Sequence, residues 1–346
     1  MNYIAQPCRL PDILLVHGTE PYNAETPLHL LNENCSLLDP RTIFRRNHGP
    51  LPNIRENDHI LYINGLIEQP LELNMVQLRK FDKHTVVSAI QCAGNRRSEM
   101  SETETTQGLQ WRAGTISNCS YSGARIGHIL KKARCRKTTG LHIVIACDIQ
   151  KCDEDGNYET SIPIEKAMSE ECLLAYEMNG KVLPREHGFP VRAVIPGFAG
   201  ARMTKFVTRI TVQEKESSSY YQQHDYKILP PHITSQQQAS AYWSNVLSIQ
   251  EMPVNSAITS PQSGEAVISK EGRVELTGYA VAGPGGCVKS VYVGDGDHWI
   301  EANLQKSSER WAMVFWNTTL LDVTPETVIY CRAVDESGKL DGFSKD

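Results

Sequence analysis

The sequence predicts an α+β protein in two parts, a mixed α+β domain followed by a β-sandwich. Up to about residue 250, short β-branched runs alternate with a few helical patterns, which is typical of a mixed domain. Residues 228–247 contain two adjacent prolines, three consecutive glutamines and several serines, a composition typical of a linker. From about Met252, short strand patterns recur between glycine-rich turns, which favours a sandwich. We therefore expect domains over residues 1–235 and 250–346.

The first domain contains both strand and helix patterns. Residues 64–78 indicate a turn, a strand and a short helix, and residues 122–133 carry apolar residues at helical spacing before a basic end. Residues 86–91 form an apolar, β-branched run that predicts a strand. Further strands are predicted over residues 141–146, 191–195 and 206–212, the second of them stopped by a Pro-Gly pair.

The second domain consists of strand patterns only. Strands are predicted over residues 274–280, 287–293, 311–316 and 327–334. The glycine-rich stretch 283–286 superficially resembles a phosphate-binding loop. Because it joins two strands and precedes no helix, we interpret it as a hairpin turn.

The composition excludes several classes of protein. The net charge of −5 argues against binding to nucleic acid. No apolar stretch approaches the roughly 20 residues that span a bilayer, so we expect no membrane association. Ten cysteines occur without Cys-x-x-Cys pairs, which favours reduced thiols over a disulfide framework. Since the N-terminus has no basic or amphipathic targeting pattern, we expect a cytoplasmic protein by default.

Cys92 is the most informative residue of the chain. The run 86–91 leads to this thiol, small residues follow it, and Arg96 and Arg97 come next. A strand that ends in a small-residue turn lets other groups approach its backbone closely. Two adjacent guanidinium groups would favour the thiolate and attract anions. Cys92 could therefore be a soft metal ligand, a nucleophile or a redox thiol, and the alternative is a buried structural cysteine.

Residues 92–97, Cys-Ala-Gly-Asn-Arg-Arg, are similar to the signature of the molybdenum-cofactor domain of the sulfite oxidase family. Other blocks resemble the same family and follow the family's order. They cover residues 21–27, 44–52, 108–117, 158–163, 173–180, 187–192, 196–205, 221–227 and 253–261. Because so many blocks match in order, the chain is identified as a member of this family.

The resemblance implies a molybdopterin-binding α+β domain and an immunoglobulin-like domain that forms a homodimer. It implies a cofactor of molybdenum bound to molybdopterin, with neither haem nor flavin, because the stretch before Pro21 leaves no room for a haem domain. The implied reaction is oxidation of sulfite to sulfate by oxygen-atom transfer. Electrons would pass to oxygen or to an external carrier such as cytochrome c. Some relatives are mitochondrial, so that compartment is the alternative to the cytosol.

The resemblance also implies roles for individual residues. Cys92 would be the protein ligand of molybdenum. Arg46, Arg97 and Lys205 would bind the substrate anion, and Tyr158 would be the active-site tyrosine. The cofactor would be held by Phe44, Arg45, Arg46, Asn47, His48, Asp148, His187, Arg192, Met203, Thr204 and Lys205. Asp148 is included as the cofactor-binding acid, although the spacing over residues 146–157 departs from the family.

Structural roles are the alternatives for several of these residues. Arg45 would ordinarily be a solvated side chain, and His48 and His187 would ordinarily be structural histidines. The chain also departs from the family at its end, where a Trp-Asn-x-Arg-Gly segment and its substrate-binding arginine are expected. The resemblance therefore predicts a second domain without its last strand.

The resemblance and the departures from it leave two alternative functions open. One is a nitrate reductase-like or other oxyanion oxidoreductase, because nitrate reductases share the domain pair and the cysteine. Those proteins usually carry asparagine where Tyr158 stands, which favours sulfite. The other is a catalytically impaired dimer that still binds the cofactor, because the expected C-terminal arginine is missing.

Overall fold

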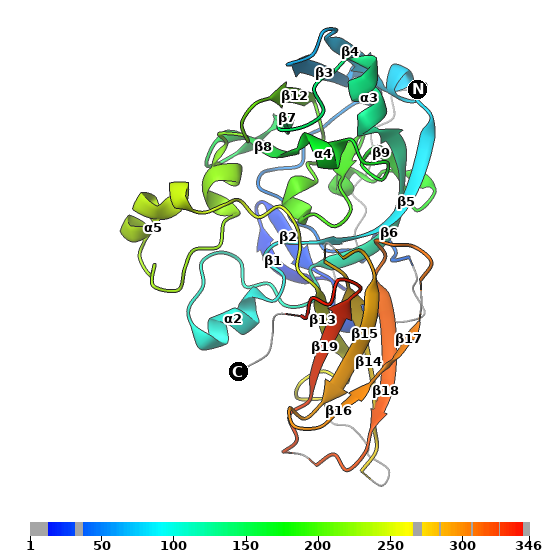
Figure 1. The fold of residues 1–346 in the computed structure, drawn as a ribbon, viewed down its shortest axis with the longest axis vertical. Helices are drawn as coiled ribbons and strands as arrows, with labels where there is room; N and C mark the ends of the chain where they lie inside the picture. Colours follow the sequence, from blue (N-terminus) through cyan, green and yellow to red (C-terminus); the bar gives the residue numbers. More distant parts are fainter. Residues whose placement is uncertain are drawn as a thin grey trace.

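The computed structural model describes residues 13–31, 37–265, 272–283, 285–305, 307–324 and 326–341. Figure 1 shows a mixed α+β part, in which α2–α5 are labelled, and a sandwich of strands β13–β19 beneath it. The predicted α+β class is confirmed. Within the described residues, no helix has both the length and the apolar character needed to cross a bilayer.

Cys92 directly follows the edge strand of one antiparallel sheet in the first part. The strand order of this sheet is β10-β9-β6-β5, and β11 pairs with β9 on the side of the sheet. The strands are β5 (Lys83–Gln91), β6 (Ile116–Arg125), β9 (Leu173–Met178), β10 (Lys181–Val182) and β11 (Arg192–Val194). Strand β5 ends at Gln91, so the next residue, Cys92, leaves the sheet at its edge.

A second sheet carries the loops that face this edge. Its strand order is β4-β3-β12-β7-β8, and β12 pairs parallel with β3. The strands are β3 (Ile60–Gly65), β4 (Leu71–Asn74), β7 (His142–Cys152), β8 (Gly156–Pro163) and β12 (Arg209–Gln213). Apolar side chains of both sheets belong to one core, with Ile116, Ile145 and Ile210 buried in it.

Short helices and one hairpin complete the first part. The hairpin joins β1 (Leu15–Thr19) and β2 (Tyr22–Glu25). The α-helices are α1 (Met75–Leu78), α2 (Arg97–Thr103), α3 (Ile126–Lys132), α4 (Ile164–Ala167) and α5 (Gln236–Tyr242). Single 3-10 turns cover Leu28–Leu30, Glu56–Asp58, Arg185–His187, Gly200–Arg202 and Trp243–Asn245, and a π-turn covers Tyr221–Asp225.

Three sequence predictions differ from the structure. The stretch 283–286 was expected to be a hairpin turn, but the strands before and after it, β14 (Val274–Val281) and β15 (Val288–Gly294), lie in two different sheets, so it connects the sheets. Residues 122–125 were expected to begin a helix, but they continue strand β6 because they pair with β9. The predicted linker 228–247 contains helix α5. Ser235 caps this helix, since its side chain accepts a hydrogen bond from the Gln238 backbone and the Gln238 side chain accepts one from the Ser235 backbone.

The second part is a sandwich of a four-stranded and a three-stranded sheet. The first has the order β13-β14-β18-β17, with β13 (Asn255–Ser260), β14 (Val274–Val281), β17 (Asn303–Gln305) and β18 (Val314–Leu320). The second has the order β16-β15-β19, with β15 (Val288–Gly294), β16 (Trp299–Glu301) and β19 (Tyr330–Asp335). Leu276, Val291 and Trp316 are buried between the sheets. The chain end, where a last strand was expected to be missing, includes residues 342–346, which lie outside the described residues.

The sandwich packs directly against the strand that leads to Cys92. Ala89 of β5 donates a backbone hydrogen bond to Trp311 at 2.8 Å. Arg96 donates to the Ser256 carbonyl at 2.8 Å, so the loop after Cys92 is held from the sandwich as well. Arg96 therefore serves the contact between the two parts of the chain.

Candidate active site

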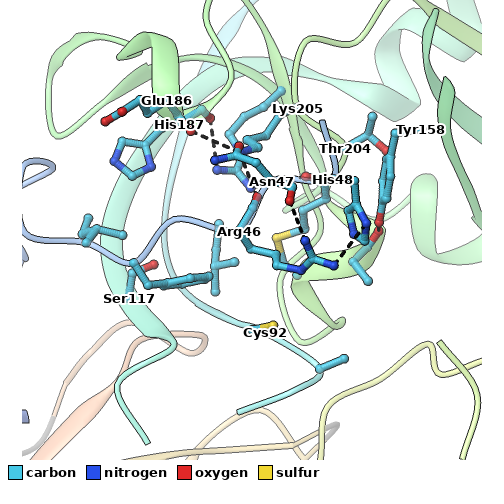
Figure 2. Close-up of a pocket in the computed structure, with 18 of the residues that line it drawn as sticks. Arg46, Asn47, His48, Cys92, Ser117, Tyr158, Glu186, His187, Thr204 and Lys205 are labelled. Atoms are coloured by element: carbon cyan, nitrogen blue, oxygen red, sulfur yellow. Dashed lines mark hydrogen bonds between the residues drawn. The ribbon is translucent and has the colours of Figure 1, made fainter. Parts of the chain in front are cut away.

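A cavity lies at the end of β5, lined also by residues of β7 and β8 and by the segments 43–48 and 186–205. It measures about 790 Å³ when its opening to solvent is included. Figure 2 shows Cys92 on one side of it and a group of basic side chains on the other. Its lining comprises Ile43, Phe44, Arg46, Asn47, His48, Ile90, Cys92, Ala93, Ser117, Tyr121, Gln150, Tyr158, Glu186, His187, Arg192, Gly200, Ala201, Met203, Thr204, Lys205 and Tyr226.

The structure brings most of the predicted site residues to this cavity. Those that line it are Phe44, Arg46, Asn47, His48, Cys92, Tyr158, His187, Arg192, Met203, Thr204 and Lys205. Arg45, Arg97 and Asp148 are not among the lining residues. Segments separated by more than a hundred residues thus meet at one place.

Cys92 presents a buried thiol to the cavity. Its side chain is 6% exposed, and the Gly94 backbone N–H donates to Sγ at 3.4 Å. Burial raises the pKa of the thiol, and the charges of Arg46 and Arg97 oppose that shift without outweighing it. Arg96 and Arg97 were expected to favour the thiolate, but the cations named here are Arg46 and Arg97, and burial outweighs them. A metal cation bound at Sγ would supply the missing positive charge.

Lys205 places an ammonium group among other cations. Its Nζ donates to the carbonyl oxygens of Arg46 at 3.0 Å and Glu186 at 3.2 Å, and to Asn47 Oδ1. Burial, together with Arg192 and other neighbouring cations, lowers the pKa of Lys205 to about 7. Glu186 supplies the one carboxylate among the described lining residues. The cavity is therefore suited to an anion, which would stabilise these buried cations.

Two further groups extend this basic side of the cavity. Arg192 donates to the carbonyl oxygens of His187 at 3.1 Å and Met203 at 3.3 Å. His187 Nε2 donates to the Pro40 carbonyl at 2.8 Å, which leaves Nδ1 as an acceptor. Burial and nearby cations lower the pKa of His187 well below its usual range, so the imidazole is neutral.

Arg46, His48 and Tyr226 form a chain of hydrogen bonds along the cavity wall. Arg46 Nη2 lies 3.1 Å from His48 Nδ1, and His48 Nε2 lies 2.6 Å from the Tyr226 hydroxyl. Arginine can only donate, so Nδ1 accepts and the neutral imidazole carries its hydrogen on Nε2. Burial and the charge of Arg46 lower the pKa of His48, which favours this neutral form. His48 therefore donates to the Tyr226 oxygen, and the phenol hydrogen remains available for another acceptor.

Tyr226 is a site residue that the sequence reasoning missed. The predicted tyrosine, Tyr158, also lines the cavity, but its hydroxyl already donates to the Ala201 carbonyl at 2.7 Å. The Tyr226 hydroxyl also forms a hydrogen bond with the Tyr158 hydroxyl. Because Tyr158 donates to Ala201, Tyr226 is the donor in this pair, and a ligand in the cavity would take the place of Tyr158 as the acceptor. The signal was present in the sequence, because Tyr226 lies in the block 221–227 that resembles the family.

Arg45 and Arg97 do not line the cavity. Arg45 is 1% exposed, and its Nε donates to Glu186 Oε2 at 3.0 Å, so the expectation of a solvated side chain is wrong. Arg97 Nη1 donates to the Leu109 carbonyl at 3.0 Å. Its charge still acts on Cys92 and on Asp225, although its side chain does not line the cavity.

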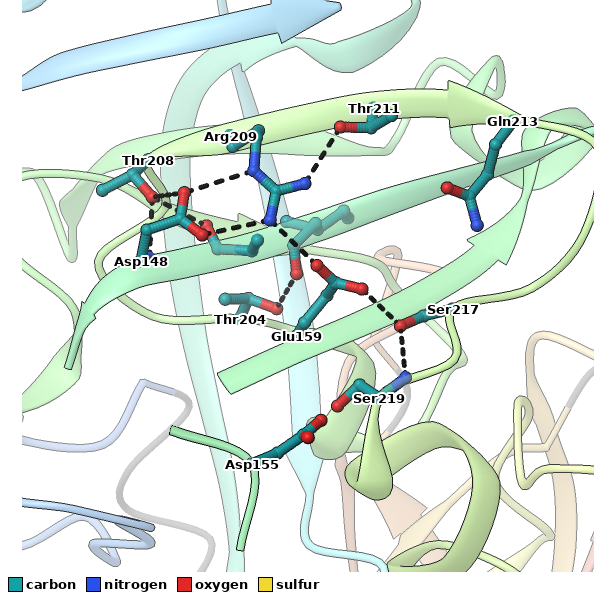
Figure 3. A network of polar contacts seen from close by, with 12 residues as sticks. Asp148, Asp155, Glu159, Thr204, Thr208, Arg209, Thr211, Gln213, Ser217 and Ser219 are labelled. Atoms are coloured by element: carbon teal, nitrogen blue, oxygen red, sulfur yellow. Dashed lines mark hydrogen bonds and ion pairs between the residues drawn. The ribbon is translucent and has the colours of Figure 1, made fainter. Parts of the chain in front are cut away.

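Asp148 lies in a different polar network, shown in Figure 3. Its carboxylate accepts from Arg209 Nη2 at 3.0 Å and from the Thr208 hydroxyl at 2.9 Å. Arg209 also pairs with Glu159 at 2.9 Å. The structure thus places Asp148 outside the cavity, in a surface ion pair. An irregular register between Cys147 and Lys151 in the β7–β8 pair lies close to this position.

Other lining residues had not been considered from the sequence. Gln150, from the irregular part of β7, donates through Nε2 to the Gly49 and Pro50 carbonyls at 3.1 and 3.2 Å and thereby holds the loop after His48. Ser117 and Tyr121 come from β6, the neighbour of β5 in the sheet. Ser117 ends the block 108–117 that resembles the family, whereas Tyr121 lies outside every such block and reaches the cavity through the pairing of β6 with β5.

Comparisons with known proteins agree with this arrangement. Residues 48–221 match the family described as the oxidoreductase molybdopterin binding domain, and residues 246–342 match the Mo-co oxidoreductase dimerisation domain. The fold and the site thus define a molybdopterin-binding oxidoreductase. The chain belongs to the sulfite oxidase family.

Individual relatives support the assignment. The chain is 40% identical to the mitochondrial sulfite oxidase of Mus musculus, over 97% of this chain and 62% of that protein. It is 35% identical to the sulfite oxidase of Arabidopsis thaliana, over 98% of this chain and 90% of that protein. Among solved structures, the sulfane dehydrogenase SoxCD from Paracoccus pantotrophus superposes with a TM-score of 0.78 at 26% identity, over 94% of this chain and 79% of that one. The chain thus spans 62% of the length of the mouse relative.

The residues present fit a molybdenum–molybdopterin cofactor. The soft sulfur of Cys92 is a donor that suits a thiolate-bound transition metal. The lowered pKa of Lys205 indicates buried positive charge that an anionic group would stabilise. Arg192 and His187 lie on the same side and offer donors or acceptors to a phosphate and a pterin ring. These residues would hold the cofactor, with Cys92 as the metal ligand.

Proposed function

We propose that this protein oxidises sulfite to sulfate in a molybdenum-dependent reaction. The observation that carries the proposal is the position of Cys92 in a cavity with Arg46 and Lys205. A small oxyanion needs fixed cations beside the metal ligand, and this cavity supplies both. The relatives from Mus musculus and Arabidopsis thaliana, both named sulfite oxidase, support the choice of substrate.

The side chains would divide the work as follows. The bound cofactor supplies oxygen-atom transfer at its metal. Arg46 would hold the substrate oxyanion through charge-assisted hydrogen bonds, and Lys205 would add a second positive charge behind it. Asn47 Oδ1 and the backbone carbonyl oxygen of Glu186 accept hydrogen bonds from the Lys205 ammonium group and hold it in place. The substrate oxyanion would thus be oriented by cations whose positions are fixed by the protein.

Tyr226 would be the group that donates to a substrate or product oxygen. His48 donates to the phenol oxygen, so the phenol hydrogen can be given to a ligand. Burial raises the pKa of Tyr226 well above its usual range, so the phenol stays protonated while it donates. Tyr158, which the sequence favoured for this role, would instead hold the turn at Ala201.

The test is sulfite-dependent reduction of ferricyanide by the purified, molybdenum-loaded protein. We expect saturable turnover with sulfite and none with nitrate as the oxidant for a reduced dye. Turnover with nitrate in place of sulfite would assign the protein to the nitrate reductase-like alternative. Bound molybdopterin without either activity would identify a cofactor-binding dimer that is catalytically impaired.

We further propose that the protein works as a homodimer and passes its electrons to oxygen or to an external carrier such as cytochrome c. The match of residues 246–342 to a dimerisation domain supports the homodimer. The scatter of ten cysteines without paired motifs supports a reducing compartment, the cytosol first and the mitochondrion as the alternative. Sedimentation of the purified protein tests the dimer, and oxygen consumption with and without cytochrome c tests the acceptor.

Sulfate binding to the cofactor-free protein should weaken as the pH rises above about 7. Lys205 has a pKa of about 7 in the cavity, and a bound anion favours its charged form. Above pH 7, binding therefore requires uptake of a proton, and the affinity falls by up to about tenfold per pH unit. Calorimetric titration with sulfate near pH 6 and near pH 8.5 measures the effect.

The matched control is Lys205→Arg, because arginine remains charged over this range. Its sulfate affinity should change little between the two pH values. Equal affinity of the unsubstituted protein at both pH values would contradict the assignment of Lys205 as the titrating group.

A further inference from the structure

Residues 92–98, called here the Cys92 loop, run from the end of β5 into the first turn of α2. They are held against residues 111–115, called here the 111–115 strap, which contain a turn at Ala113 and Gly114. Backbone N–H groups of Cys92, Arg96 and Ser98 donate to strap carbonyls at 3.0 Å each. Their acceptors are Thr115, Arg112 and Trp111 in the same order. The strap carbonyls therefore fix the course of the loop at its start, its middle and its end.

The Asn95 side chain adds a further contact between the loop and the strap. Its Nδ2 donates to the Ala113 carbonyl at 3.0 Å and to the Thr115 hydroxyl at 3.1 Å. Tyr279 of the sandwich donates to the same Ala113 carbonyl at 2.7 Å. The position of the Cys92 loop therefore depends on the position of the strap.

The other side of the strap rests on one carboxylate, that of Glu25. Oε1 accepts from the Gly114 N–H at 2.7 Å, and Oε2 accepts from the Arg112 N–H at 2.9 Å. His17 Nε2 lies 2.9 Å from the same Oε2. Glu25 is 1% exposed and ends strand β2, so its carboxylate is held inside the protein.

The packing at Gly114 leaves no room for the strap to move closer to the hairpin. A Cβ at this glycine would lie 1.9 Å from the Thr26 carbonyl oxygen and 3.0 Å from the Glu25 side chain. The strap backbone therefore lies directly on the end of β2. A carboxylate can accept from both strap N–H groups at once, whereas an amide has only one oxygen.

We propose that Glu25 is a positioning residue, which sets the place of Cys92 in the active site through the 111–115 strap. Glu25 does not line the cavity and touches no group assigned to substrate or cofactor. It acts through two layers of hydrogen bonds, from its carboxylate to the strap and from the strap to the Cys92 loop. The expected effect of Glu25 on sulfite turnover rests on the proposed function. Its expected effect on the position of the backbone of residues 92–98 does not.

The test compares amide hydrogen exchange in Glu25→Gln and in the unsubstituted holoenzyme. A glutamine side chain keeps the shape but presents an NH₂ group to one of the two strap N–H groups. We expect exchange at Arg112 and Gly114, and also at Cys92, Arg96 and Ser98, to be at least about tenfold faster. At equal molybdenum content we expect kcat to fall about tenfold. KM for sulfite should stay within about twofold, because Arg46 and Lys205 are not displaced.

The matched control is Asp335→Asn in the sandwich. Asp335 is also fully buried and its Oδ1 accepts from a backbone N–H, that of Lys339, at 3.0 Å. This variant removes the same charge but lies in β19, away from the strap, so exchange in the Cys92 loop should not change. Glu25→Asp, which keeps the charge and shortens the side chain, is the second variant at the site and should show the same pattern.

Faster exchange in the strap with unchanged exchange in the Cys92 loop and unchanged kcat would overturn the proposal, since Glu25 would then support the fold alone. Unchanged exchange in both segments would overturn it too. The same conclusion would follow if neither Glu25 variant yielded folded protein while Asp335→Asn did. A parent enzyme without sulfite turnover would refute the proposed function, and the exchange comparison would still decide the role of Glu25.

Discussion

Replacement of Cys92 by serine is expected to lower sulfite turnover by at least about 100-fold at equal pterin content. A serine hydroxyl is a hard donor that remains protonated near neutral pH, so it does not replace a thiolate at a soft metal site. The other lining residues keep their contacts, because Cys92 Sγ accepts only from the neighbouring Gly94 N–H among the described hydrogen bonds. Turnover and pterin content are measured on the same purified sample.

Cys172→Ser is the matched control for this substitution. Cys172 is also fully buried, and its Sγ bonds to the Lys166 carbonyl at 3.1 Å, a contact that a serine hydroxyl can keep. It does not line the cavity. We expect this variant to retain turnover. Normal turnover in Cys92→Ser would refute the assignment of Cys92 as the metal ligand.

The second large effect is expected from Tyr226→Phe, with kcat about 100-fold lower. His48 donates to the Tyr226 oxygen, so the phenol can give its own hydrogen to another group. Removing the hydroxyl would therefore remove a hydrogen-bond donor to the reacting oxygen. KM for sulfite should change much less, since Arg46 keeps its place on the opposite side of His48. Steady-state kinetics with ferricyanide separate the two parameters.

Tyr158→Phe is the comparison that distinguishes the two tyrosines. Its hydroxyl donates to the Ala201 carbonyl, so its removal costs a buried hydrogen bond, about 1–3 kcal/mol of stability. We expect a lower melting temperature with kcat reduced by less than about tenfold. The reverse order, a larger loss of kcat in Tyr158→Phe, would return the catalytic role to the tyrosine that the sequence favoured.

Local patterns explain why much of the site was predictable. A strand that ends in small residues is recognisable from adjacent positions, and β5 followed by Cys92 is such a case. The basic residues of the cavity lie in short blocks that resemble the family, so Arg46, Arg192 and Lys205 were found without knowledge of the fold. Each block needs only its own residues to be recognised.

The misses share a different cause. Residues 122–125 have helical spacing, yet their backbone groups pair with β9, and tertiary pairing overrides the local preference. Asp148 was predicted to bind the cofactor, but its carboxylate pairs with Arg209 of β12 and does not line the cavity. From the sequence, Arg45 is expected on the surface, but it is buried because it pairs with Glu186, which is distant in sequence. Contacts of this kind are not encoded in any one segment.

The sequence by itself determined the α+β class, the family, the cofactor class and the cysteine that faces the cavity, because each follows from short-range order of residues. Only the tertiary structure decided which tyrosine has a hydrogen to donate, since that depends on whether His48 or Ala201 lies beside the hydroxyl. It also decided that Glu25 lies under the strap next to Cys92, because the hairpin and the strap are brought together only by folding. Burial raises the pKa of Cys92 and lowers that of Lys205, and burial is a property of the whole fold.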